Sequence, residues 1–192
     1  LQDLKSVYID LNDINAYASY VNSIGGNIRL EVGEQDSLTY IAAEKLFMRG
    51  DNDGARRSLI NYLQTFPEGA FSSNANFYLG SIAFAKKEFD EAIQRFKSVI
   101  ASGDTKFLEE SVARTAEIEY LSKDYPAALE SFKRLQIVAE NPENRQAARL
   151  GIMRCALQTG QQKDALLAAD ELLKEPKLSP ELEAEARYVR AK

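Results

Sequence analysis

The sequence AFSSNANFYLGSIAFAKKEFDEAIQRFKSVIASG, from Ala70 to Gly103, contains two amphipathic helical patterns in succession. Apolar residues recur at helical spacing in each half, and the polar residues 86–88 separate the halves. Gly80 in the first half and Ala92 in the second are small, as residues must be where two antiparallel helices cross closely. The stretch therefore predicts a helical hairpin.

The hairpin pattern recurs along the chain. Its second helix carries an alanine at intervals of 37, 36 and 37 residues, and we name Ala55, Ala92, Ala128 and Ala165 the marker alanines. The residues twelve positions before them, which we expect to pack against them, are Ala43, Gly80, Ala116 and Met153. Three of these four are small, so the fourth hairpin departs from the pattern.

These hairpins resemble the tetratricopeptide repeat (TPR) family. Leu79-Gly80, Phe89, Ala92 and Phe96 occupy the positions that the family fills with a Leu-Gly pair, an aromatic residue, an alanine and an aromatic residue. The resemblance implies an all-α fold, a right-handed superhelix of about four regular hairpins. The expected repeats are residues 36–69, 72–105, 106–142 and 143–177, followed by a lone helix over 180–192.

The helix boundaries follow from the apolar patterns and from the proline positions. We expect helices over residues 36–49, 52–65, 72–86, 89–102, 106–122, 125–140, 143–159, 161–174 and 180–191. Pro67, Pro142 and Pro176 are expected to end second helices, and Pro180 to open the last helix. That last helix either continues into a longer array or caps this one.

Residues 1–34 are expected to form a separate, degenerate hairpin with a linker, and residues 35–192 the repeat array. Two apolar stripes, over residues 1–11 and 14–24, flank an Asn12-Asp13 cap. Gly25-Gly26 should end the second stripe, and the alternation of Ile28, Leu30 and Val32 predicts a short extended segment. Because the chain begins with Leu1 and not Met, we expect a fragment of a longer protein.

Composition argues against several classes of function. The net charge of −5, with basic residues scattered among acids, disfavours nucleic acid, and no run of residues is apolar enough for membrane insertion. The chain has no histidine and one cysteine, Cys155, which we expect to be a packed apolar group. We therefore predict neither an enzyme nor a bound metal or cofactor. The Asp51-Asn52-Asp53-Gly54 run lacks the glutamate of a calcium loop and is predicted to be a turn.

The expected binding surface is the concave side, which first helices line in such arrays. Counting back eight, eleven and fifteen residues from each marker alanine gives an aromatic series flanked by acids. The candidate ligand-binding residues are Tyr40, Glu44, Phe47, Phe77, Ser81, Phe84, Glu117, Tyr120, Arg154 and Leu157, with Ala113 and Leu150 at the same offsets. The alternative, that these aromatics are mostly core, stays open.

The residues at those offsets differ from the basic and amide residues with which some TPR proteins hold a carboxylate, so that function is not implied. The joint TFPEGAFSSNANFYLG, residues 65–80, is similar to bacterial cell-envelope TPR proteins, such as the Tol-Pal coordinator and the outer-membrane assembly lipoprotein. This resemblance implies a periplasmic or envelope location; otherwise the location is cytoplasmic. The predicted function is a scaffold for a peptide or protein partner, and the alternative is a self-association module that forms homo-oligomers.

Overall fold

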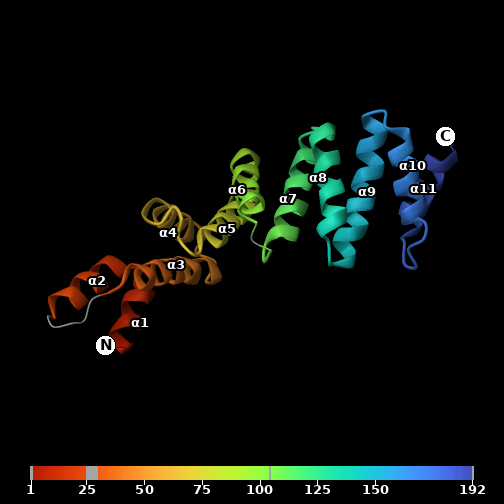
Figure 1. Cartoon of the computed structure of the whole chain (residues 1–192). Helices are drawn as coiled ribbons and strands as arrows, with labels where there is room; N and C mark the ends of the chain where they lie inside the picture. The colour runs from red at the N-terminus through yellow and green to blue at the C-terminus, as the bar shows by residue number, and fades with distance from the viewer. Residues whose placement is uncertain (1, 25–29, 104, 192) are drawn as a thin grey trace. The chain divides into compact units, whose positions relative to one another are not determined.

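The structure is a computed structural model that describes residues 2–24, 30–103 and 105–191, and its ordered elements there are eleven α-helices (Figure 1). The predicted all-α architecture of consecutive helical hairpins is confirmed. The chain divides into two compact units, Leu1–Ser98 and Val99–Lys192, and the boundary falls inside α6. In the described part of the chain, no helix combines the length and the apolar character that crossing a bilayer requires.

Unit 1 (Leu1–Ser98) begins with a short hairpin that covers one side of the next helix. Its helices are α1 (Gln2–Asp10), α2 (Ile14–Ser23), α3 (Val32–Met48), α4 (Asn52–Thr65), α5 (Ser72–Ala85) and the start of α6 (Phe89–Ser102). Asp13 caps α2 by accepting a hydrogen bond from the Ala16 backbone N–H. Ile14, Tyr17 and Val21 of α2 are buried with Leu38 and Ala42 of α3, which gives the N-terminal hairpin its hydrophobic contact.

Unit 2 (Val99–Lys192) contains two further hairpins and a final helix. They are α7 (Leu108–Leu121), α8 (Tyr125–Val138), α9 (Pro142–Gln158), α10 (Gln162–Leu172) and α11 (Pro180–Ala191). Successive helices pack on one another, and α7 also contacts α9, so the first helices of neighbouring repeats lie side by side (Figure 1). The candidate site described below lies between α7 and α9.

All four marker alanines are fully buried, as are Ala43, Ala116 and Met153, which places them inside the hairpins. Gly80 is buried too, but its closest neighbour is not its expected partner. A Cβ atom on Gly80 would lie 2.9 Å from the ring of Phe96, one turn beyond Ala92 in α6. The small residue is therefore required chiefly by the aromatic ring that follows the marker alanine.

Each first helix of the four repeats ends in the same way. The residue five positions before the marker alanine has a left-handed backbone, with φ of 81° at Gly50, 60° at Lys87, 63° at Lys123 and 73° at Gly160. The next residue in each case donates its N–H to a carbonyl five residues back, as Asp124 does to Glu119 at 2.9 Å. Since Gly adopts this backbone without strain and Lys does not, the two lysines are the less favourable choices.

A carboxylate near the start of a first helix holds the turn that leads to the next repeat. Asp36 Oδ2 accepts the Ala70 backbone N–H at 2.9 Å. Glu109, which like Asp36 lies nineteen residues before its marker alanine, accepts the N–H groups of Glu140 and Asn141 at 2.9 and 3.1 Å. The turn hydrogen bonds are thus satisfied by the side chain of a helix two elements earlier.

Two local predictions were wrong. Val32 was expected in an extended segment, but it begins α3, whose first turn is held by an ion pair of 2.7 Å between Lys5 and Glu34 that no local pattern reveals. Pro142 was expected to end a second helix; instead α8 ends at Val138, and Pro142 is the first residue of α9, where its missing N–H costs nothing. The predictions for Leu1, Gly25, Gly26 and Ile28 lie outside the described residues.

Candidate functional site

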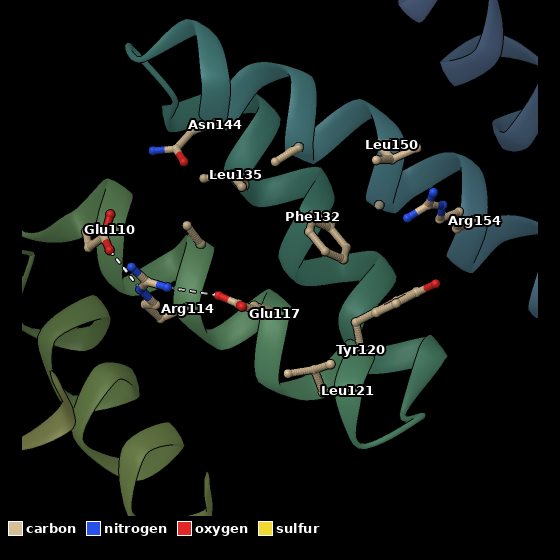
Figure 2. Close-up of a pocket in the computed structure, with 13 residues that line it drawn as sticks. Glu110, Arg114, Glu117, Tyr120, Leu121, Phe132, Leu135, Asn144, Leu150 and Arg154 are labelled. Atoms are coloured by element: carbon tan, nitrogen blue, oxygen red, sulfur yellow. Dashed lines mark hydrogen bonds and ion pairs between the residues drawn. The ribbon is translucent and has the colours of Figure 1, made fainter. Parts of the chain in front are cut away.

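A pocket of about 300 Å³ opens on unit 2 between α7 and α9, with α8 behind it (Figure 2). Its lining residues are Glu110, Ala113, Arg114, Glu117, Tyr120 and Leu121 of α7, Phe132 and Leu135 of α8, and Asn144, Ala147, Leu150, Gly151 and Arg154 of α9. The interior is mostly apolar, and the charged groups lie on the two first helices. Such a concave apolar site with a few polar groups is the usual form of a binding pocket.

The back of the pocket depends on one glycine. A Cβ atom at Gly151 would lie 2.4 Å from the ring of Phe132, so the absent side chain lets the ring lie directly on the α9 backbone. Phe132 is 8% exposed and makes an edge-on contact with Tyr120, with 6.4 Å between ring centroids. Together, Phe132 and Tyr120 form an aromatic surface that is fixed before any ligand arrives.

On the α7 side, one arginine lies between two glutamates. Arg114 donates from Nε to Glu110 Oε1 at 2.8 Å and from a terminal nitrogen to Glu117 Oε2 at 3.1 Å, as Figure 2 shows. The three residues share one helix face, at spacings of four and three residues. This side of the pocket therefore carries two negative charges and one positive charge.

On the α9 side, the charge is balanced. Arg154 donates two hydrogen bonds, of 2.8 and 2.7 Å, to the two carboxylate oxygens of Glu185 in α11. The hydrogen bond to Glu185 raises the pKa of Arg154, and the same bond lowers the pKa of the Glu185 carboxyl. The bidentate geometry holds the guanidinium at the pocket edge and neutralises it there.

The candidate residues from the second half of the array mostly meet at this pocket. Glu117, Tyr120 and Arg154 line it, as do Ala113 and Leu150 from the same offsets. Leu157 does not line it; it lies on the last turn of α9 and is 39% exposed. Residues at the same offsets from the marker alanines of two repeats therefore lie in one pocket.

The candidate residues of unit 1 form a packed cluster. Tyr40 and Tyr78 both donate their hydroxyl hydrogens to Glu44 Oε1, at 2.7 and 3.0 Å. Tyr40 is 2% exposed and stacks on Phe71 at 4.4 Å, and burial raises the pKa of its hydroxyl. This placement favours the core alternative for Tyr40.

The other four unit 1 candidates are half-buried. Phe47 packs against Tyr78 at 4.6 Å, Phe77 against Phe96 at 6.1 Å, and Phe84 against Phe89 at 6.0 Å. Ser81 donates its hydroxyl hydrogen to the Phe77 carbonyl within the same helix. A role in ligand binding stays a prediction for these residues.

Several lining residues did not appear among the candidates, although the sequence holds the signal for them. Arg114 and Gly151 lie fourteen residues before their marker alanines, and Glu110 and Ala147 lie eighteen before. An offset of eighteen continues the predicted face by one helical turn beyond fifteen, and an offset of fourteen lies on the same face, three residues from eleven. Phe132 and Leu135 come from a second helix, so counting along first helices could not reach them.

Two further candidates have structural roles. Asp51 caps α4 by accepting the Gly54 N–H at 2.9 Å, and a Cβ at Gly54 would lie 2.2 Å from that carboxylate, so the acidic run caps and begins α4 and does not form the predicted turn. Burial of Cys155 raises the pKa of its thiol to about 11, which keeps the thiol protonated and unreactive near neutral pH. Within the described ranges, no group of three His, Cys, Asp or Glu side chains is arranged to hold a metal ion.

Stacked helical hairpins with a pocket between first helices define a helical-repeat protein. Residues 42–105 match the family model of the tetratricopeptide repeat, a repeat that generally serves in protein-interaction scaffolds. No curated protein sequence matches the chain.

Solved structures with the same fold are distant in sequence. A crystal structure of the MamA protein is 17% identical, with a TM-score of 0.61 over 83% of this chain and 86% of that one. A putative kinesin light chain of TPR-like repeats from Podosopora anserina is 14% identical, with a TM-score of 0.52 over 98% of this chain and 92% of that one. At these identities the likeness shows the fold alone.

Proposed function

We propose that this chain is a non-catalytic scaffold that binds a peptide or protein segment, and that the pocket between α7 and α9 receives an apolar side chain of that segment. The observation that carries the proposal is the pocket itself, with its aromatic surface and its volume of about 300 Å³. An apolar cavity of roughly half that size holds a benzene molecule. One or two large side chains of a partner therefore fit.

The polar groups of the pocket support binding and not chemistry. Its two arginines are held in ion pairs with glutamates, Arg114 with Glu110 and Glu117 and Arg154 with Glu185. Arginines held in this way can orient a ligand and disfavour ligands that do not match them, because moving the side chains would break their hydrogen bonds. A few anchoring side chains supply most of the energy at such surfaces.

Peptide selection tests this function. A displayed library of random peptides of about a dozen residues should yield binders, whose affinities are measured by fluorescence anisotropy. Ala147, exposed at the pocket edge, is changed to Trp to fill the cavity; the matched control is Ala184→Trp on an exposed position of α11. We expect Ala147→Trp to weaken binding by about tenfold or more and Ala184→Trp to leave it unchanged. Binding that survives Ala147→Trp would remove the pocket from the proposal.

We further propose that the scaffold acts in a bacterial envelope assembly or transport complex. The support is the joint over residues 65–80, which resembles envelope TPR proteins. A fusion of the native protein to alkaline phosphatase tests the location, since that reporter needs an oxidising compartment for its disulfides. Fusion protein that accumulates without phosphatase activity would contradict an envelope location.

Self-association is the alternative function. On α11, Tyr188 is 61% exposed and offers an apolar ring on the outer surface of the last helix. If a second copy covers this helix, light scattering should show a dimer that Tyr188→Lys dissociates. Val189 is unsuitable for this test because it is 3% exposed and belongs to the core. A monomer in solution would exclude the alternative.

A further inference from the structure

The charges around the pocket are not balanced, and this imbalance bears on the chemistry of the partner. We propose that the bound segment carries a lysine or arginine within about one helical turn of its apolar anchor, and that Glu110 and Glu117 receive it. This inference rests on the proposed function of the same pocket. It adds the sign of the charge that the pocket selects.

The two glutamates have unused capacity for hydrogen bonds. Each gives one carboxylate oxygen to Arg114, and in the described part of the chain the second oxygen of each accepts no hydrogen bond. A carboxylate offers about four acceptor positions. Their side chains are 42% and 46% exposed, so a cation from a partner can reach either one without displacing protein atoms.

The rest of the pocket does not cancel this charge. One guanidinium, that of Arg114, faces two carboxylates, which leaves a net charge of −1 on the α7 side. Arg154 on the α9 side is paired with both oxygens of Glu185 and contributes no net charge. An acidic segment would meet repulsion at α7, or would have to take an arginine from its carboxylate partner.

The spacing of the two acids suits a side chain beside the anchor. Glu110 and Glu117 lie seven residues apart on α7, about two turns or 10 Å along the axis, with Ala113 and the open pocket beside them. An anchor seated on Tyr120 and Phe132 therefore has Glu117 beside it, three residues before Tyr120 on α7, and Glu110 two turns further along the same helix. Lysine and arginine have apolar stems that can lie over the roughly 5 Å of helix surface between Tyr120 and Glu117.

The experiment uses the peptides selected above and a double-mutant cycle. In the best binder, the basic residue next to the apolar anchor is changed to glutamine, and both peptides are titrated against the wild-type protein and Glu110→Gln/Glu117→Gln. The matched control, Glu130→Gln/Glu140→Gln, removes two exposed charges outside the pocket. The single variant Glu117→Gln serves if the double variant fails to fold.

We expect selected peptides to combine a large apolar residue with Lys or Arg. Loss of the basic residue should weaken binding about three- to fivefold on the wild type and the control, and less than about twofold on the pocket variant. The difference should shrink as salt rises from about 50 to about 500 mM.

Each contrary outcome has a distinct meaning. The selected peptides could carry neutral or acidic residues beside the apolar anchor and still be weakened by Ala147→Trp. That result would overturn the charge inference and leave the proposed function standing. A library without any binder, or binders indifferent to Ala147→Trp, would overturn the pocket's function itself.

Discussion

The hydroxyl of Tyr62 lies 2.6 Å from Asp36 Oδ1, and this buried hydrogen bond joins α4 to the start of α3. The second oxygen of Asp36 accepts the Ala70 N–H, and the Tyr62 oxygen accepts the Phe71 N–H at 3.0 Å. Burial, followed by the bond to Asp36, raises the pKa of Tyr62. One carboxylate and one phenol thus satisfy the backbone of the turn between α4 and α5.

Removing this carboxylate should destabilise unit 1. Asp36→Ala leaves the buried Tyr62 hydroxyl and the partly buried Ala70 N–H without their acceptor, which should cost about 2–4 kcal/mol of unfolding free energy. Urea unfolding followed by circular dichroism measures the loss. Glu68→Gln, on an exposed residue of the same turn, should change the free energy by less than about 0.5 kcal/mol. Equal effects of the two variants would contradict the structural role of Asp36.

A glycine at the end of α7 should stabilise the protein. Lys123 has a φ of 63°, at the position where the first and fourth repeats have Gly50 and Gly160. Lys123→Gly relieves the strain of a left-handed lysine, and the greater freedom of glycine in the unfolded chain offsets part of the gain. The expected result is about 0.5–1 kcal/mol of added stability. Gly160→Lys should lower stability by a similar amount, and the pair of variants is compared by thermal melting.

The pocket should close when Gly151 gains a methyl group. Because the new Cβ would lie 2.4 Å from the Phe132 ring, Gly151→Ala should cost about 1–3 kcal/mol and displace the ring. A Cβ at Gly33, in the first turn of α3, would meet nothing within 4 Å, so Gly33→Ala should be neutral or slightly stabilising. Combining Gly151→Ala with Phe132→Leu should recover part of the stability. A neutral Gly151→Ala would show that Phe132 can move freely.

Stability should depend on pH through Glu109. Although burial acts to raise its pKa, hydrogen bonds from Asn144 and from the N–H groups of Glu140 and Asn141 lower it below the usual 4.5. A lowered native pKa means that the ionised form stabilises the fold above the unfolded pKa, and that this contribution is lost as pH falls through the native pKa. Glu109→Gln should therefore cost about 1–3 kcal/mol near neutral pH. The difference from wild type should shrink below pH 4.5, as measured by urea unfolding across pH.

The sequence predicted the hairpins well, because their periodicity and the marker alanines are local features. The predicted ranges for the helices that became α4, α6 and α11 match the structure. The start of α3 at Val32 was missed, and the first turn of α3 there carries an ion pair between Glu34 and a distant lysine, Lys5. Local patterns contain no information about such contacts.

The site could be predicted only in part. Fixed offsets along first helices found Glu117, Tyr120 and Arg154, because the repeat brings equivalent positions to one surface. They could not show that Tyr40 is buried by Phe71, nor that Arg154 is neutralised by Glu185, thirty-one residues later. Charge balance at a surface depends on pairs that only the folded chain brings together.

The carboxylates of Asp36 and Glu109 mean that a hairpin is not a self-sufficient module. Each acid lies at the beginning of one repeat, while the N–H groups that it accepts belong to the entrance of the following one. Cutting the chain after Thr65 would remove the Ala70 N–H that donates to Asp36. Cutting it after Val138 would remove the N–H groups that donate to Glu109. Any shortened version of this protein should therefore keep the first turn of the successor repeat.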